Sequence, residues 1–237
     1  METVDDLQCG GYRIIQDTDG FKFGTDAVLL ADFAKNVRGK RLLDLCTGNG
    51  IVPILLAAKT NVEKIYGIEI QTKAAETAAR SVQLNGLTER IQIINGDLRE
   101  KHFEKRFFDA VTCNPPYMKA SSAIVNENDA KMIARHEICC SLEDVISAAA
   151  SLLTVGGRFF MVHRPTRLAE VITCMKKYKL EPKRLRLVYP DRLSEPVLFL
   201  TEGLLFGKEE IRIMPPLFLK GEDGGESGEL KAIYGRK

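Results

Sequence analysis

Short apolar runs alternate with segments of helical spacing along most of the 237-residue chain. Continuous apolar runs that end at glycine, asparagine or charged residues predict buried strands at 41–47, 64–68, 91–94, 107–113 and 158–163. Apolar residues at helical spacing predict helices at 27–33, 51–59, 74–85, 141–155 and 166–178. Strands that alternate with helices in this way are typical of βαβ units, so we predict an α/β fold with a parallel, doubly wound sheet.

The two ends of the chain carry different patterns. Residues 12–16 and 21–23 flank a Thr-Asp-Gly turn, which predicts an N-terminal β-hairpin that acts as a lid or flank. Either Thr25 or Asp26 is expected to cap the helix that follows. Near the other end, the β-like runs 185–189 and 197–206 are joined by a short turn, which predicts an antiparallel pair at one edge of the sheet.

The length of 237 residues fits one α/β domain or two small domains, and we expect one domain, with a sizeable core supported by the 45% of residues that are hydrophobic. We divide this domain into an N-terminal hairpin and helix (1–35), a core (36–219) and a flexible tail (220–237). The tail prediction rests on the acidic, glycine-rich stretch 221–228, which is expected to be disordered in the unbound protein.

The spacing of the cysteines indicates whether the protein binds a metal, and the N-terminal sequence indicates where in the cell it is located. The six cysteines, at positions 9, 46, 113, 139, 140 and 174, include no C-x-x-C pair, so we expect no metal site and no disulfide framework. The chain shows no basic leader and no apolar run of membrane-spanning length. We therefore expect a cytoplasmic protein that does not enter a membrane.

The stretch Asn114-Pro115-Pro116-Tyr117 follows the fourth predicted strand. Two consecutive prolines remove two backbone donors and form a rigid corner with outward-facing carbonyl acceptors. The Asn114 side-chain oxygen and the Pro115 carbonyl can together accept both hydrogens of a planar amino group, while Tyr117 offers a face for stacking a flat ring. We call this predicted arrangement the amino clamp. The structural alternative is that Asn-Pro initiates a turn and Tyr117 caps the core.

Polar residues and glycines follow four successive predicted strands: Asp44 with Gly48 and Gly50, then Glu69, Asp97 and Asn114. Ligands of open α/β sheets bind at these carboxyl ends, where Glu69 is placed to accept hydrogen bonds from a ribose diol. A nicotinamide dinucleotide is a competing ligand, but Pro53 replaces the third glycine of its fingerprint and the clamp has no role in hydride transfer. S-adenosylmethionine, a nucleoside without pyrophosphate, fits better, with Asp97 accepting from its adenine amino group.

Four motifs resemble, in order, those of class I S-adenosylmethionine-dependent amino methyltransferases. They are Asp-Leu-Cys-Thr-Gly-Asn-Gly at 44–50, Gly-Ile-Glu at 67–69, Gly-Asp-Leu at 96–98 and Asn-Pro-Pro-Tyr at 114–117. With residues 20–30 upstream and Ala-Arg-His-Glu at 134–137 downstream, the chain most resembles the bacterial tRNA(Val) adenine-N6 methyltransferases.

The resemblance implies a Rossmann-like fold with a seven-stranded, mostly parallel sheet, and tRNA as the partner. It implies that Leu98, in the third motif, belongs to the cofactor site, and that Thr25 lies near the methionine end of the cofactor. Lys22 and Phe23 are implied to lie near the entrance. The implied reaction is N6-methylation of an adenosine beside the anticodon, with valine specificity carried over from the family.

The clamp suits this reaction because the exocyclic nitrogen of adenine has its lone pair delocalised into the ring. Two acceptors, Asn114 and the Pro115 carbonyl, favour a pyramidal nitrogen aimed at the methyl group, so positioning and electrostatics suffice without a strong base. A base in a tRNA loop can be splayed out and stacked on Tyr117.

Basic residues mark candidate RNA contacts. The formal net charge is +2, but residues 164–192 hold nine basic against three acidic residues, an excess of +6. We expect this segment to contact RNA, with an ordinary solvated face as the alternative. Arg135 and His136 are candidate substrate-binding residues that order a loop or touch phosphate, and an acid/base role for His136 is the alternative.

Three other functions are compatible with the clamp. A protein glutamine-N5 methyltransferase would use it on an amide, but that family carries an N-terminal helical domain for which residues 1–40 leave little room. A ribosomal RNA guanine-N2 methyltransferase is the closer alternative, although that family differs after Asn-Pro-Pro and often has a duplicated domain. A non-catalytic RNA-binding module is the third, and the joint presence of Glu69, Asp97 and Asn114 argues against it.

Overall fold

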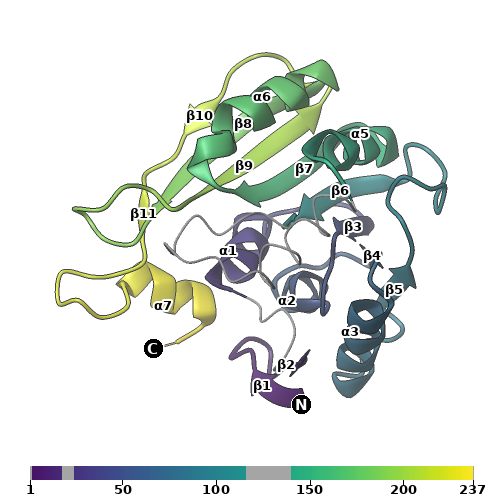
Figure 1. Cartoon of the computed structure of the whole chain (residues 1–237), viewed down its shortest axis with the longest axis horizontal. Coiled ribbons are helices and arrows are strands. Elements are labelled where there is room, and N and C mark those ends of the chain that lie inside the picture. Colours follow the sequence, from purple (N-terminus) through teal and green to yellow (C-terminus); the bar gives the residue numbers. More distant parts are fainter. Residues whose placement is uncertain (1, 18–23, 116–139, 237) are drawn as a thin grey trace, which may run out of the picture.

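A mostly parallel sheet occupies the centre of the molecule (Figure 1), for which the computed structural model describes residues 2–17, 24–115 and 140–236. Its strands in this part of the chain are β3 (Arg41–Leu45), β4 (Lys64–Glu69), β5 (Ile91–Asn95), β6 (Phe108–Cys113), β7 (Leu153–His163), β8 (Leu180–Tyr189), β9 (Leu198–Leu205), β10 (Arg212–Ile213) and β11 (Leu217–Phe218). Their order is β10-β8-β9-β7-β6-β3-β4-β5, and β11 also pairs with β8.

Strand β9 alone among these is antiparallel to its neighbours, β7 and β8, whereas every other pairing is parallel. The predicted mostly parallel sheet with an antiparallel pair near one edge is therefore confirmed. The seven long strands match the expected strand number, and the two-residue strands β10 and β11 extend the sheet beyond β8.

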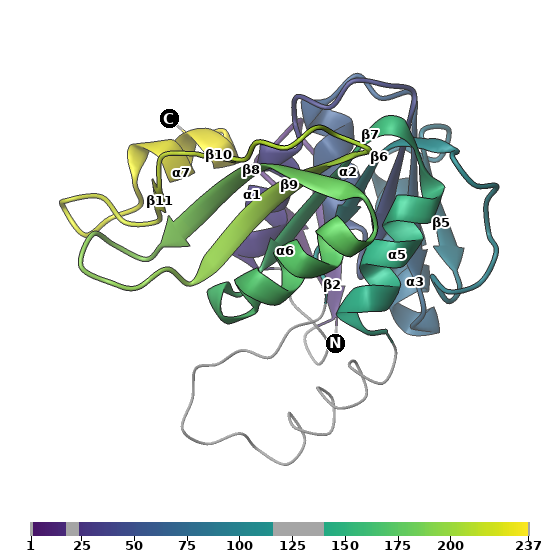
Figure 2. The same ribbon diagram turned by 90° about the horizontal axis from the view of Figure 1, so that it is seen from above.

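Helices cover both faces of the sheet (Figure 2). Those described are α1 (Thr25–Phe33), α2 (Ile51–Lys59), α3 (Thr72–Leu84), α5 (Leu142–Leu152), the 3-10 helix η1 (Pro165–Arg167), α6 (Leu168–Lys177) and α7 (Gly228–Tyr234). Apolar side chains of α1, α2 and α7 pack in one core cluster, which we call the α1 side. Those of α5 and α6 pack in a second cluster on the opposite face, the α5 side.

An N-terminal hairpin flanks the sheet, but its strands differ from the prediction. Strand β2 (Arg13–Asp17) pairs antiparallel with β1 (Glu2–Asp6), a partner that the pattern did not predict. The expected partner, 21–23, lies outside the described residues. The hairpin docks on α3, where the Asn85 side chain accepts from Arg13 N–H (2.8 Å) and donates to the Arg13 carbonyl (2.6 Å).

Local signals at two helix starts had different outcomes. The sequence Ser-Leu-Glu-Asp at 141–144 predicts a capping box at the start of α5. This is confirmed, because the Ser141 hydroxyl accepts from Asp144 N–H (3.1 Å) and the Asp144 carboxylate accepts from Ser141 N–H (2.8 Å). The prediction that Thr25 or Asp26 caps α1 was wrong. Gly24 holds the N-cap position without a side-chain hydrogen bond, and both residues lie within the first turn.

The end of the chain is folded, so the prediction of a disordered, flexible tail was wrong for the described residues. The glycine-rich stretch closes through a hydrogen bond from Gly221 N–H to the Gly225 carbonyl (2.8 Å). It leads into α7, whose Leu230 and Ile233 are buried against α1 and α2. These two apolar residues lie one turn apart, beyond the acidic stretch whose composition suggested disorder, and their burial stabilises the segment.

Candidate active site

The carboxyl ends of four neighbouring strands, β6, β3, β4 and β5, lie side by side, and the order of the strands reverses direction at β3. From β3 the chain continues outward to β4 and β5, then crosses to β6 on the other side of β3. Parallel pairing places the carboxyl ends of these strands side by side, since Leu45 lies opposite both Ile68 and Cys113. A topological switch point of this kind is where open α/β sheets bind their ligands. The structure therefore gathers the segments that carry the predicted cofactor residues.

Strand alternation orients the site residues toward one face. In β3, Leu42 belongs to the core on the α1 side, and Leu43 and Leu45 belong to the core on the α5 side. Successive side chains point to opposite faces, so Asp44 projects to the α1 side. Thr112 of β6 joins it there, because its hydroxyl donates to the Asp44 carboxylate (2.6 Å).

The glycine-rich turn after β3 is built on left-handed backbone. Gly48 and Gly50 have φ angles of 57° and 85°, a region that favours glycine. A Cβ at Gly50 would lie 3.1 Å from the Ala78 side chain of α3, whereas a Cβ at Gly48 would project into open space. The predicted tight turn is confirmed, and Gly48 leaves backbone accessible to a ligand.

Glu69, at the end of β4, is held against this turn. One carboxylate oxygen accepts from Gly48 N–H (2.9 Å) and the other accepts from Gln71 N–H (2.9 Å). The residue is 5% exposed, so these two bonds fix the carboxylate in one orientation. Each carboxylate oxygen has a second lone pair, which leaves capacity for two hydroxyl donors.

Asp44 is almost fully buried, at 1% exposure. Burial raises the pKa of its carboxyl group to about 7, although the hydrogen bond from Thr112 lowers it. Asp44 therefore carries a proton for part of the time near neutral pH. The sequence analysis did not predict Thr112 as a site residue. Its position was a signal for such a role, because it is a hydroxyl residue inside an apolar strand, two positions before Asn114.

Asp97 and Leu98 follow β5. Arg99 donates from Nε to both Asp97 carboxylate oxygens, at 2.9 and 3.0 Å, and this hydrogen bonding lowers the pKa of Asp97. An adenine amino group at Asp97 would therefore share the carboxylate with a guanidinium. Leu98 is partly buried and packs on the α5 side. The predicted cofactor roles of both residues stay predictions.

Asn114 and Pro115 come directly after β6. The Asn114 side-chain oxygen is buried and has no hydrogen-bond partner among residues 2–17, 24–115 and 140–236, and Pro115 is buried. A buried carbonyl oxygen without a partner is costly, so its position at a ligand edge points to a donor that arrives with the substrate. Pro116 and Tyr117, together with Lys22, Phe23, Arg135 and His136, lie outside the described residues, so their predicted roles stay untested.

Thr25 begins α1, and its hydroxyl lies 3.5 Å from the phenol oxygen of Tyr234 in α7. No sequence signal connected these residues, which are separated by 209 positions. The predicted role of Thr25 at the cofactor stays a prediction.

Three cysteines gather beneath the site. The sulfur atoms of Cys46 and Cys140 lie 3.9 Å apart, and hydrogen bonding with Cys113 raises the pKa of Cys46. Burial raises the pKa of Cys113, so these thiols stay protonated and pack as small hydrophobes. Across residues 2–17, 24–115 and 140–236, no three potential metal ligands gather into a metal site.

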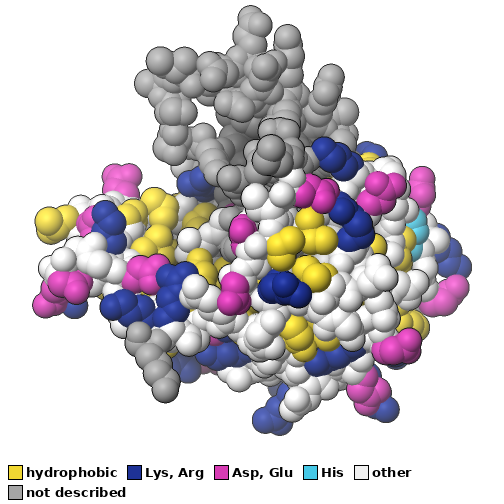
Figure 3. Space-filling view, turned by 90° about the horizontal axis from the view of Figure 1, so that it is seen from below, with side chains coloured by type: hydrophobic (Ala, Val, Ile, Leu, Met, Phe, Trp, Pro, Cys, Tyr) yellow, Lys and Arg dark blue, Asp and Glu magenta, His cyan; other side chains and the backbone are white. Residues whose placement is uncertain are grey.

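The charge of the basic segment 164–192 is partly offset by acidic residues from other parts of the chain. Lys177 pairs with Glu143 (2.5 Å), Arg186 with Glu229 (2.7 Å) and Arg192 with Glu222 (3.3 Å), and Arg184 pairs with the buried Glu202. All four acidic partners lie outside the segment, so the segment's surroundings are less positive than its own excess of +6, and its contact with RNA stays a prediction. Basic and acidic side chains are also interspersed on the face that carries α7 and the hairpin (Figure 3).

Comparison with known proteins identifies the family of this fold and site. The family model described as "Methyltransferase small domain" matches residues 18–178. The chain belongs to this methyltransferase family. It is also 31% identical over 199 residues to a protein of Porphyromonas gingivalis named tRNA1(Val) (adenine(37)-N6)-methyltransferase, covering 81% of this chain and 77% of the relative. A relative of the same name from Aeromonas salmonicida is 29% identical, covering 69% and 68%.

Solved structures agree on the methyltransferase fold. A predicted O-methyltransferase from Agrobacterium tumefaciens superposes with a TM-score of 0.71 at 21% identity, covering 90% of this chain and 98% of that one. A geranyl diphosphate methyltransferase in complex with S-adenosylmethionine gives a TM-score of 0.54 at 16% identity, covering 76% and 84%. The predictions of family, fold and S-adenosylmethionine as cofactor are thereby confirmed. Among the described helices, none is long and apolar enough to span a bilayer.

Proposed function

We propose that this protein transfers a methyl group from S-adenosylmethionine to N6 of an adenosine in tRNA, next to the anticodon of tRNA(Val). The observation that carries the proposal is the buried side-chain oxygen of Asn114 at the switch point of the sheet, which has no partner within the described part of the chain. The names of the relatives support adenosine and tRNA(Val) as target and substrate.

The residues at the strand ends fit the cofactor. Glu69 is fixed by two backbone donors and keeps two free lone pairs for the ribose hydroxyls. Gly48, with open space at its Cβ position, permits close approach of the nucleoside. In this proposal Asp97 and Leu98 border the adenine, while Asp44 and Thr25 lie toward the methionine end. When bound, the cofactor supplies a methyl group on a positively charged sulfur.

The clamp acts on the target amino group. Asn114 accepts one hydrogen of that group through its side-chain oxygen, and Pro115 accepts the other through its carbonyl. Both acceptors are held by rigid backbone at the end of β6, so they do not need to reorganise during transfer. The nitrogen lone pair is thereby directed out of the ring plane, and the amine can lose its proton to solvent after transfer.

Product analysis tests this proposal. Purified protein is incubated with isotopically labelled S-adenosylmethionine and unmodified tRNA(Val), and the digested nucleosides are separated by mass spectrometry. The expected product is labelled N6-methyladenosine, and the Glu69→Ala variant serves as a control with weakened cofactor binding. Label in N2-methylguanosine, or transfer to a glutamine peptide but not to tRNA, would contradict the proposal in favour of the corresponding alternative.

A further inference from the structure

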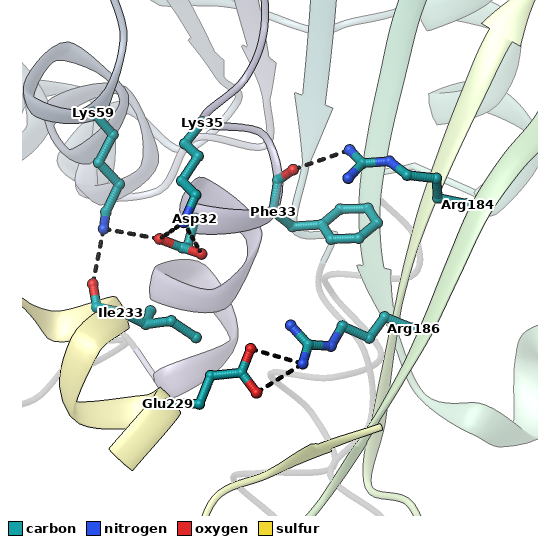
Figure 4. Close-up of polar contacts among 8 residues, drawn as sticks. All are labelled: Asp32, Phe33, Lys35, Lys59, Arg184, Arg186, Glu229 and Ile233. Carbon is teal, nitrogen blue, oxygen red and sulfur yellow. Dashed lines mark hydrogen bonds and ion pairs between the residues drawn. The ribbon is translucent and has the colours of Figure 1, made fainter. Parts of the chain in front are cut away.

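The last turn of α7 is tied to the two helices that pack beside it on the α1 side (Figure 4). Lys59, the final residue of α2, donates to the Ile233 carbonyl (2.8 Å) and pairs with Asp32 of α1 (3.2 Å). The last carbonyls of a helix have no partner within the helix, so the Lys59 ammonium satisfies one of them. The side chains of Lys59 and Asp32 are 13% and 15% exposed, and the contact therefore joins α1, α2 and α7 in a largely buried position.

The first turn of α7 is anchored separately. Glu229 forms an ion pair with Arg186 of β8 (2.7 Å), and the Arg186 side chain is 14% exposed. Strand β8 also holds the end of α1, because Arg184 donates to the Phe33 carbonyl (3.2 Å) and its guanidinium lies 4.4 Å from the Phe33 ring centre. With both of its ends attached, α7 has a defined position relative to α1 (Figure 4).

Tyr234 closes α7 and reaches the first residue of α1. Its hydroxyl lies 3.5 Å from the Thr25 hydroxyl, and its ring packs against the core of the α1 side. Arg236, two residues after Tyr234, contacts the hairpin, because it donates to the Gln8 side chain (2.5 Å). Its guanidinium also lies over the Tyr234 ring, 4.4 Å from the ring centre. The ring is therefore confined by Arg236 on one side and by the core on the other.

We propose that Tyr234 is a positioning residue for methyl transfer, which holds Thr25 in place for the methionine end of the cofactor. The inference rests on the proposed function, because it takes Thr25 as a cofactor contact. A hydroxyl held in one position before binding loses less conformational freedom when the ligand arrives, so affinity increases. The contact joins α1 and α7, whereas Asn114 and Pro115 follow β6. Loss of Tyr234 should therefore affect cofactor binding more than the rate at saturating cofactor.

The test compares Tyr234→Phe and Tyr234→Ala with Tyr178→Phe, a matched control that loses a phenol hydrogen bond to Glu143 (2.5 Å) on the opposite face. Calorimetry with S-adenosylmethionine and steady-state kinetics with tRNA give Kd, KM and kcat. We expect Kd and the cofactor KM to rise about threefold for Tyr234→Phe and about tenfold for Tyr234→Ala, with kcat nearly unchanged and the control like wild type. Tyr234→Phe should add nothing in a Thr25→Ala background.

The possible failures are distinguishable. Wild-type affinity in both folded Tyr234 variants, with normal binding by the wild type, would overturn the positioning role alone. Additive effects of Tyr234→Phe and Thr25→Ala would do the same. Absence of cofactor binding by the wild-type protein would overturn the proposed function and this inference with it.

Discussion

Replacing Asp44 by asparagine should remove a specific pH dependence from the stability of the cofactor-free protein. Asparagine keeps an oxygen that can accept from the Thr112 hydroxyl, which lies 2.6 Å from the Asp44 carboxylate, but it does not titrate. Burial raises the pKa of Asp44 from 3.8 to about 7 in the folded chain. The folded state therefore binds a proton that the unfolded state has already released between about pH 4 and pH 7, and the stability of the wild type falls as pH rises through this window.

The size of the effect follows from the two pKa values. For a single group with pKa 3.8 unfolded and about 7 folded, the stabilisation lost between pH 5 and pH 8 is about 2.5 kcal/mol. Urea denaturation of both proteins at pH 5, 6, 7 and 8 measures it, because the other titrating groups are shared and cancel in the difference. The wild type should lose about 2.5 kcal/mol relative to Asp44→Asn over this range.

The pH dependence of cofactor binding is a second measurement of the ionisation of Asp44. A positively charged cofactor favours the ionised carboxylate, so the wild-type affinity for S-adenosylmethionine should rise about tenfold from pH 6 to pH 8. The Asp44→Asn variant should lack this rise, because its side chain does not titrate. Parallel stability curves for the two proteins would refute the reasoning, since they would show that Asp44 titrates alike in the folded and unfolded states.

Two further changes test the cofactor site and the basic segment. Glu69→Ala should weaken S-adenosylmethionine binding by on the order of 1.5–3 kcal/mol for each charged hydrogen bond lost, and unchanged calorimetric affinity with an intact circular dichroism spectrum would remove Glu69 from the site. Reversing the charges of Lys176 and Lys177 should leave the salt dependence of tRNA binding nearly unchanged, because these residues pair with Glu181 (3.4 Å) and Glu143 (2.5 Å). If the slope of log K against log salt concentration fell by about two units instead, the two lysines would be phosphate contacts.

Local patterns predicted the central sheet well. Helix α2 spans Ile51–Lys59 as expected, and strands β3 and β6 follow their apolar runs closely. Strand β7 instead begins at Leu153, where the predicted helix 141–155 was too long. These elements are encoded in their own residues, because a continuous apolar run between turn residues can be buried only as a central strand or core helix. The strand-end residues Asp44, Glu69 and Asn114 were predictable for the same reason, since parallel strands bring their carboxyl ends together.

Features that depend on distant residues were not predictable in this way. The folding of α7 depends on partners far along the chain, such as the contact between Lys59 and Ile233. The pairing of β1 with β2 is local, but the apolar pattern did not mark β1 as a strand. The charge around segment 164–192 was not predictable from the segment alone, because its acidic partners, including Glu143 and Glu229, lie outside it. Cys46 adopts a left-handed φ of 58° that cysteine rarely takes, and the sequence held no signal for it.

The most direct test of the amino clamp is single-turnover methyl transfer by Asn114→Ala, measured together with cofactor affinity and thermal melting. If Asn114 holds the target amino group, transfer should fall by roughly 10²–10³ while the cofactor Kd and the melting temperature stay close to wild type. The unpartnered state of its buried oxygen supports this outcome, because its removal breaks no hydrogen bond of that oxygen within the described chain. A variant that melts early but transfers at the wild-type rate per folded molecule would contradict the clamp.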